Sequence, residues 1–136
     1  MEKEFIPYEQ ALALKELGFD EHCMSRYYSI DTPEKNKLMM FSPQYPKKYN
    51  SEKFEIGNII SFPFISAPLY QQAFRWFREK YDIHGIISYY GKGQWFLEVL
   101  DYKGNQLIQI ENNTFWSYEE AELECLKKLI EIVKEK

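Results

Sequence analysis

Cysteine and histidine are the side chains of this chain best suited to nucleophilic or metal chemistry, and it has two of each: Cys23, Cys125, His22 and His84. His22 directly precedes Cys23, and neighbouring side chains on an extended segment point apart, so these two cannot form a thiolate–imidazole pair. His84 can meet a thiol only through the fold. A Cys and His pair is therefore one alternative, and a buried, unreactive thiol is the ordinary outcome for Cys125 on an apolar helix face.

Motifs for metals, nucleotides and serine hydrolysis are absent from the sequence. The spacing of His22, Cys23 and His84 matches no zinc pattern. No GxGxxG, GxxxxGK or GxSxG pattern occurs, and Gly91-Lys92-Gly93 precedes no helix that could hold a phosphate. The two cysteines are far apart in sequence, which fits reduced thiols rather than a disulfide framework. We therefore expect no cofactor, no metal and no catalytic residue.

Glu98 is the carboxylate that most deserves a test for acid–base chemistry. It stands alone on a strand whose other residues are mostly apolar. Burial would raise the pKa of its carboxyl group and suit it to proton transfer, whereas contact with a lysine or with water is the more ordinary outcome. A small enzyme that uses Glu98 or a Cys and His pair is therefore kept as an alternative function.

Basic and aromatic residues alternate in the irregular stretch from Ser42 to Ser66, where Tyr45, Lys47, Lys48 and Tyr49 come together. Long connections in small domains often carry function. Lysines interleaved with aromatic rings can hold phosphates and stack bases, which makes single-stranded nucleic acid a second alternative partner. A surface loop whose tyrosines pack onto the domain is the structural alternative.

Length and charge narrow the class of protein. The 136 residues, 45% hydrophobic and 18% aromatic, are enough for one domain with its own core, which we place over 1–136. A net charge of −4 argues against nonspecific nucleic-acid binding, which relies on many Lys and Arg contacts to phosphates. The charged start MEKEF lacks the apolar core of a signal peptide, and no stretch has the length of a membrane span. We expect a cytoplasmic protein.

The segment from Ala67 to Tyr81 carries the clearest structural signal, an amphipathic helix. Its apolar side chains fall in one sector of a helical wheel: Leu69, Tyr70, Ala73, Phe74, Trp76, Phe77 and Tyr81. The opposite sector presents Gln71, Arg75 and Arg78 one turn apart. We interpret the aromatic side as core, and the polar side either as a solvated face or as a contact strip for a partner.

The other elements predict an α+β fold. A short helix over Pro7 to Leu17 stops at Gly18, and strands over Cys23–Ile30 and Leu38–Phe41 form a hairpin. The long connection has a short strand near Phe54 to Ile60, and the aromatic helix follows it. A three-stranded antiparallel meander comes next, over Ile83–Tyr90, Gln94–Tyr102 and Gln106–Glu111. The order is helix, hairpin, long loop, helix, meander and helix, with the helices packed on the sheet.

The C-terminal helix begins at the capping sequence Ser117-Tyr118-Glu119-Glu120. Its apolar stripe is broad and includes Ala121, Cys125, Leu126, Leu129, Ile132 and Val133. Such a stripe is wider than one sheet face requires, so a homodimer through this helix is an alternative.

Three blocks of sequence are similar to a known family: FIPYEQALALKELGFDE at Phe5 to Glu21, APLYQQAFRWFREKY at Ala67 to Tyr81, and SYEEAELECLKKLIEIVKEK at Ser117 to Lys136. They resemble short uncharacterised proteins of anaerobic gut bacteria, their phages and their mobile elements. The blocks cover about two-fifths of the chain. The resemblance implies a small intracellular accessory protein, phage-derived in origin, and carries over no site residue.

The absence of catalytic motifs, the eleven tyrosines and the acidic charge together favour a non-enzymatic protein-interaction module. Its predicted contact residues are Tyr45, Lys47, Lys48, Tyr49, Gln71, Arg75 and Arg78. The expected partner is another protein. Single-stranded nucleic acid binding and a small enzyme remain the alternatives.

Overall fold

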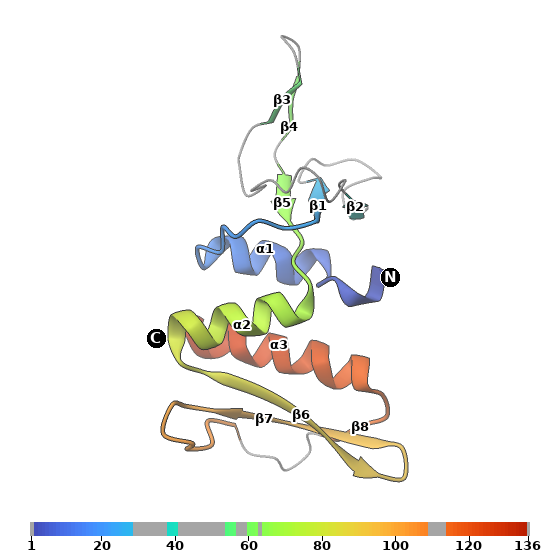
Figure 1. Cartoon of the computed structure of the whole chain (residues 1–136), viewed down its shortest axis with the longest axis vertical. Coiled ribbons are helices and arrows are strands. Elements are labelled where there is room, and N and C mark those ends of the chain that lie inside the picture. Colours follow the sequence, from blue (N-terminus) through green and yellow to red (C-terminus); the bar gives the residue numbers. More distant parts are fainter. Residues whose placement is uncertain are drawn as a thin grey trace. The chain divides into compact units, whose positions relative to one another are not determined.

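The structure is a computed structural model that describes residues 2–28, 38–40, 54–56, 60–62, 64–108 and 114–135. Its contacts divide the chain into two units, Met1–Leu69 and Tyr70–Lys136. The single domain over 1–136 therefore stays a prediction, and the two units are described separately. Figure 1 shows the elements of both units.

The first unit contains a short 3-10 helix at Glu2–Glu4, helix α1 at Tyr8–Glu16 and five short strands. The strands are β1 (Ser25–Tyr28), β2 (Leu38–Met40), β3 (Phe54–Ile56), β4 (Ile60–Phe62) and β5 (Phe64–Ser66). β1 pairs antiparallel with β2 on one side and with β5 on the other, while β3 and β4 form a separate hairpin.

The end of α1 confirms the predicted glycine stop. The Phe19 N–H donates to the Leu14 carbonyl at 2.9 Å, and Gly18 between them has φ of 97°. A side chain would strain this left-handed conformation, which glycine adopts freely. The turn sends Phe19 back into the core of the unit, where it is fully buried.

The predicted hairpin of β1 and β2 is confirmed, with Tyr27 opposite Leu38. The sequence predicts an irregular stretch up to Ser66, but the structure has a strand, β5, at the C-terminal end of this stretch. β5 joins the sheet there, and its Ile65 lies opposite Tyr27 in the unit's core. The single strand predicted near Phe54 to Ile60 is instead the β3–β4 hairpin. β5 was not predicted because a strand of three residues is too short to show a periodic pattern in the sequence, even though its central residue Ile65 is fully buried.

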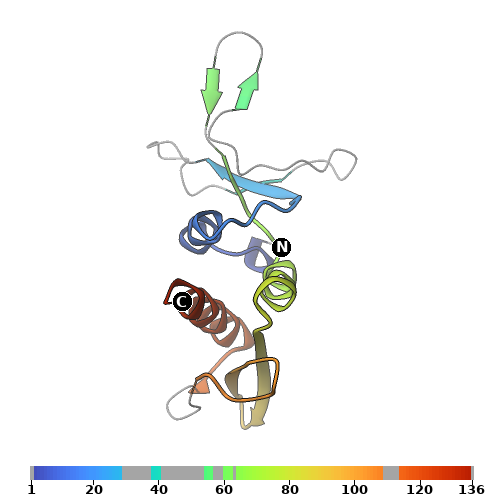
Figure 2. The same ribbon diagram turned by 90° about the vertical axis from the view of Figure 1, so that its left-hand side faces the viewer.

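The second unit contains helix α2 (Tyr70–Tyr81), strands β6 (His84–Gly91), β7 (Gln94–Leu100) and β8 (Thr114–Phe115), and helix α3 (Tyr118–Lys134). The three strands form an antiparallel sheet in the order β6-β7-β8. Helix α3 packs against all three strands and against α2. Figures 1 and 2 show both helices on the same side of this sheet. The fold class is α+β with helices packed on a sheet, as the sequence predicts.

The helix-facing side of the sheet is built from alternate residues of each strand. Leu97 and Val99 of β7 are fully buried beneath α3, and Ile87 lies opposite Leu97 on β6. The other side carries Ile86, opposite Glu98, and is only partly covered. We call it the open face.

One predicted turn and one predicted helix cap are confirmed in this unit. Lys92 and Gly93 form the tight turn between β6 and β7, with φ of 56° and 78°. The Glu120 N–H donates to the Ser117 hydroxyl at 3.1 Å, so Ser117 caps α3. Both features follow from local sequence, because turn and cap residues act on their own backbone.

The third strand of the meander lies later in the chain than predicted. Gln106 makes only an isolated bridge to Leu100, and an uninterrupted ladder from there would bring Ile110 opposite Phe96. Thr114 occupies that place instead, in β8. The segment from Gln106 to Thr114 is thus four residues longer than uninterrupted pairing with β7 would need. The composition of a strand does not show where such an insertion falls.

The broad stripe of α3 is used within the second unit. Its buried residues face both the sheet and α2: Ala121, Glu122, Cys125, Leu126, Leu129, Ile130 and Val133. Packing on two neighbours accounts for the width of the stripe without a second chain. The width of this stripe therefore gives no support to a homodimer through α3, which stays a prediction.

Gly85 sets how closely α3 approaches β6. A Cβ atom at this position would lie 2.7 Å from the Cys125 sulfur and 3.2 Å from Leu129 Cδ1. In an open strand, Gly→Ala stabilises a protein by about 0.4–1 kcal/mol, because it restricts the unfolded chain. Here we expect Gly85→Ala to destabilise the protein by about 1–3 kcal/mol through overpacking.

A double-mutant cycle checks this prediction by urea unfolding of Gly85→Ala, Cys125→Ala and the combined variant. Removing the Cys125 sulfur gives the new methyl group room, so the cost of Gly85→Ala should shrink by at least about 0.5 kcal/mol in the Cys125→Ala background. Equal costs in both backgrounds would contradict the close approach.

Candidate interaction surface

The predicted loop residues Tyr45, Lys47, Lys48 and Tyr49 lie outside the described residues, so their role stays a prediction. The predicted contact strip on α2 lies within them. Gln71, Arg75 and Arg78 are all exposed, whereas Phe74 and Phe77 on the opposite side are buried. The division of this helix into an aromatic core face and a polar outer face is therefore confirmed. That the polar face binds a partner stays a prediction.

Cys125 lies in the core of the second unit and is fully buried. Burial raises the pKa of its thiol to about 12, and the nearby negative charge of Glu122 adds to the effect. A thiol with this pKa carries almost no thiolate at neutral pH, and the thiolate is the nucleophile. Cys125 is thus a packing residue of α3, as expected for a small thiol on an apolar stripe.

Cys23 is buried in the first unit, where its sulfur donates to the Glu21 carbonyl at 3.5 Å, while its neighbour His22 is exposed. His84 opens β6 in the second unit. Cys23 donates to the backbone and Cys125 is buried with a raised pKa, so nothing observed marks either thiol as an activated nucleophile for the Cys and His alternative.

Glu98 points to the open face of the sheet, opposite Ile86, and is partly exposed. This partial exposure gives the carboxylate access to water. Nothing observed favours acid–base chemistry at Glu98.

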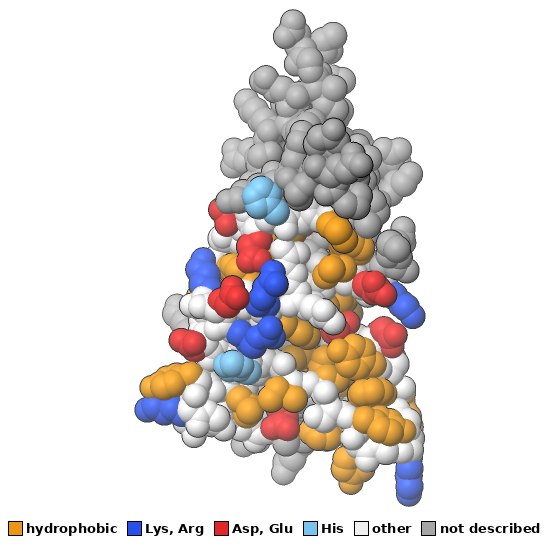
Figure 3. All heavy atoms as spheres, in the orientation of Figure 1, with side chains coloured by type: hydrophobic (Ala, Val, Ile, Leu, Met, Phe, Trp, Pro, Cys, Tyr) orange, Lys and Arg blue, Asp and Glu red, His pale blue; other side chains and the backbone are white. Residues whose placement is uncertain are grey.

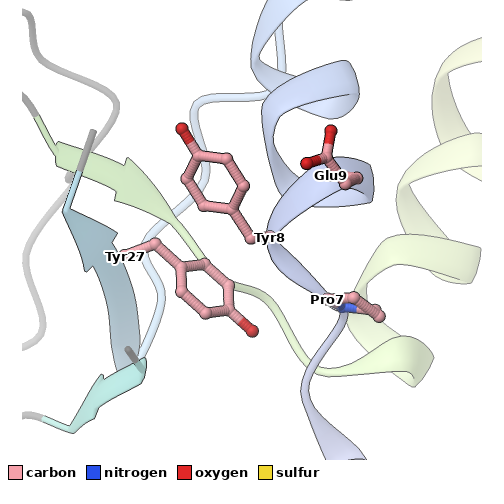
Figure 4. A pocket seen from close by; sticks show the side chains of 4 residues that line it. All are labelled: Pro7, Tyr8, Glu9 and Tyr27. Atoms are coloured by element: carbon pink, nitrogen blue, oxygen red, sulfur yellow. The ribbon is translucent and has the colours of Figure 1, made fainter. Parts of the chain in front are cut away.

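A hollow of about 320 Å³ lies between the start of α1 and β1, lined by Pro7, Tyr8, Glu9 and Tyr27. The two tyrosine rings meet edge to face with centroids 5.6 Å apart (Figure 4). The Tyr27 hydroxyl donates to the Ile6 carbonyl at 2.8 Å, which ties this ring to the backbone. Among the described lining residues, Glu9 is the one carboxylate, and the Tyr27 hydroxyl is engaged with the backbone. The hollow is therefore a packing feature of the first unit.

Exposed aromatic side chains are the most distinctive feature of the second unit. Tyr89 and Trp95 have ring centroids 4.9 Å apart, and Trp95 meets Tyr118 edge to face at 5.2 Å. Trp116 lies in the link between β8 and α3, and 72% of its surface is exposed. We call these four residues, Tyr89, Trp95, Trp116 and Tyr118, the aromatic surface.

Regular elements position three of the four members of the aromatic surface, and Trp116 lies in the link just before α3. Tyr89 and Trp95 face each other across the β6–β7 pair, and Tyr118 is the first residue of α3. The Gly93 N–H donates to the Tyr89 hydroxyl at 3.0 Å, which also holds this ring in place. The rings of Tyr89, Trp95 and Tyr118 are thus held by contacts within the chain before any partner arrives.

Carboxylates lie at the Tyr118 end of the aromatic surface, and the exposed Lys92 lies in the turn next to Tyr89. Glu119 and Glu120 are exposed in the first turn of α3, next to Tyr118. Partial burial raises the pKa of the Tyr118 hydroxyl, and the charge of Glu122 raises it further, so the hydroxyl is protonated at neutral pH. Aromatic rings beside carboxylates suit a cationic group and disfavour a phosphate.

Sequence reasoning missed the aromatic surface. Trp116 and Tyr118 are next to the predicted cap, and Trp95 was assigned to a strand that is apolar on both sides. The signal that could have located the surface is the sequence FWSY at positions 115–118, since three aromatic residues around a helix cap cannot all face one core.

Other site types find no support in the described part of the chain. No group of three or more His, Cys, Asp or Glu side chains gathers there to hold a metal ion. Among the same residues, no helix combines the length and the apolar character needed to cross a membrane.

Comparison of the chain with protein-family models, with curated proteins and with solved structures finds no match. The resemblance to short proteins of gut anaerobes and their phages therefore stays a prediction.

Proposed function

We propose that this protein is a non-enzymatic protein-interaction module and that the aromatic surface is its contact site. The observation that carries the proposal is the exposure of Tyr89 and Tyr118 beside the partly covered Trp95, together with the exposure of Trp116 two residues before Tyr118 in the chain. Tryptophan and tyrosine dominate the residues whose loss most weakens protein–protein binding. Their exposure leaves apolar area in contact with water, which a partner would cover.

The order of the rings supports binding. Ring contacts and the Gly93–Tyr89 hydrogen bond fix Tyr89, Trp95 and Tyr118 in the unbound protein. Side chains that are already ordered lose little conformational entropy on binding, so more of the contact energy contributes to affinity.

The charges beside the rings indicate the chemistry of the partner. A protein segment that presents Lys or Arg can place its cation over an aromatic ring while Glu119 and Glu120 balance the charge. The proposed partner is therefore a basic protein segment. The predicted residues Gln71, Arg75 and Arg78 on α2, and separately the predicted residues Tyr45, Lys47, Lys48 and Tyr49, stay further proposed contacts, whose cations suit an acidic part of a partner.

The substitution Trp116→Ala tests the proposal. We expect at least a tenfold loss of affinity for the physiological partner, since truncating a tryptophan that dominates a contact typically costs about 2 kcal/mol or more. The partner is first captured from the native host with the immobilised chain, identified by mass spectrometry and purified. Calorimetry then compares its binding to the wild-type and variant chains.

Tyr102→Ala is the matched control, because Tyr102 is as exposed as Trp116, at 70%, but follows the far end of β7. Its affinity should stay within about twofold of the wild type, as for a residue outside the contact. Equal affinity of the Trp116→Ala and wild-type chains would contradict the proposed site. Capture of nucleic acid alone, with affinity that falls steeply with salt, would contradict the proposed function.

A further inference from the structure

Strand β6 forms one edge of the β6-β7-β8 sheet and, among the described residues, pairs only with β7. It is the longest strand, with eight residues, His84–Gly91, and contains no proline, lysine, arginine, aspartate or glutamate. Natural proteins usually protect a sheet edge with such residues, because an unprotected edge pairs with another strand. The edge is therefore suited to strand addition.

Apolar side chains are exposed along this strand. Ile86 is 38% exposed, and Tyr89 and Tyr90 are 58% and 73% exposed. Figure 3 shows hydrophobic side chains gathered at the lower right of the view, where β6 runs in Figure 1. A strand that pairs with β6 would cover part of this surface.

The order of residues in β6 identifies the strand that fits it. Ser88 is preceded by Ile86 and Ile87 and followed by Tyr89 and Tyr90. If a second β6 lies antiparallel with its Ser88 opposite the first Ser88, each isoleucine faces a tyrosine of the other copy. Pairs of β-branched and aromatic residues are among the most favourable cross-strand pairs.

The side chains also lie on the correct faces for this register. Ile86 is opposite Glu98 on the open face, where Tyr90 contacts Phe96 at a centroid distance of 6.3 Å. Ile87 is opposite Leu97 on the helix-facing side, where Tyr89 contacts Trp95.

In each isoleucine–tyrosine pair, both side chains therefore lie on the same face of a continuous sheet. The Ile86–Tyr90 pairs lie on the open face, and the Ile87–Tyr89 pairs lie on the helix-facing side. The one irregularity of β6 lies between Tyr89 and Gly91, beyond the central pairs.

We propose that two copies of this chain associate through antiparallel pairing of their β6 strands, with Ser88 on the two-fold axis. The product is a six-stranded sheet with the helices of both copies on one side. Pairing of one strand buries less surface than a standard stable interface, so the dimer is weak and forms in the micromolar range. This proposal shares Tyr89 with the aromatic surface but rests on a different observation, the unprotected edge of β6.

Charge substitutions at Ser88 test the proposal, because in this register Ser88 of one copy lies opposite Ser88 of the other. Ser88→Lys and Ser88→Glu each place like charges opposite each other, so each should weaken self-association at least about tenfold. An equal mixture of the two variants places Lys opposite Glu and should restore a heterodimer. Sedimentation equilibrium across the micromolar range measures all three samples, and thermal melts confirm that both variants fold.

A monomeric wild-type chain throughout this concentration range would overturn the proposal. A dimer that persists unchanged in Ser88→Lys would also overturn it and would assign the contact to another surface, such as α3. Neither result bears on the Trp116→Ala binding test, so the two proposals fail separately.

Disulfide trapping gives a second measurement that fixes the register. Opposed residues of antiparallel strands have Cα atoms about 4.5–5.5 Å apart, within the range of a disulfide, so Ser88→Cys should form a covalent dimer on mild oxidation. Lys92→Cys is the matched control, because the two copies of Lys92 would lie eight residues, or about 27 Å, apart along the sheet. Equal cross-linking of the two variants, or none of Ser88→Cys, would overturn the register.

Discussion

Replacing Phe77 by alanine is expected to cost about 3–5 kcal/mol of unfolding free energy, which is much of the stability of a small protein. Phe77 is fully buried on α2 and packs against the rings of Trp76 and Tyr81, with centroids 5.1 and 6.2 Å away. The substitution removes a whole ring from the core and leaves a cavity that the sheet and helices cannot fill. Urea unfolding followed by circular dichroism measures the loss.

The neighbouring residue provides a matched control, since Arg78 is exposed on the same helix. Arg78→Ala should change the unfolding free energy by no more than about 0.5 kcal/mol. If Phe77→Ala fails to fold, Phe77→Leu still allows the comparison, with a smaller loss of about 1–2 kcal/mol. A Phe77 variant as stable as Arg78→Ala would contradict the assignment of the aromatic face to the core.

Stability should fall in alkaline solution because of Cys125. The pKa of this thiol rises from an ordinary value of 9.0 to about 12 in the folded chain, first through burial and then through Glu122. The folded state therefore holds the proton more tightly than the unfolded state. The stabilisation is complete below about pH 9 and is lost as the pH rises towards 12. The slope approaches about 1.4 kcal/mol per pH unit within this window.

Comparison with Cys125→Ala isolates this contribution, because tyrosines and lysines titrate in the same range in both chains. The wild-type chain should lose its advantage over the variant as the pH rises from about 9 to 12. Urea unfolding at a series of pH values gives the two curves. Parallel curves would show that the thiol is not protected from ionisation by the fold.

Local sequence predicted the parts of this fold that local contacts build. Gly18 ends α1, Ser117 caps α3, and Lys92 and Gly93 turn β6 into β7, each through bonds within a few residues. The aromatic face of α2 was predictable because a helix repeats every 3.6 residues whatever packs on it. These features are enough to predict the α+β fold class.

Features that depend on residues distant in sequence were not predicted. The pairing of β5 with β1 and the position of β8 are set by partners from other parts of the chain, so the composition of each strand gives no register. The same reason explains the candidate site. Polar residues of α2 were predictable as an exposed strip, whereas the aromatic surface exists only because three elements bring Tyr89, Trp95 and Tyr118 together.

The sequence by itself determined an α+β fold, its caps and turns, and the two faces of α2, because these follow from periodicity and backbone bonding over a few residues. The tertiary structure decided which tyrosines and tryptophans face solvent, which strand lies at the edge of the sheet, and that Cys125 on α3 is fully buried. Those outcomes depend on which surfaces remain uncovered after packing, and packing is a property of the assembled elements.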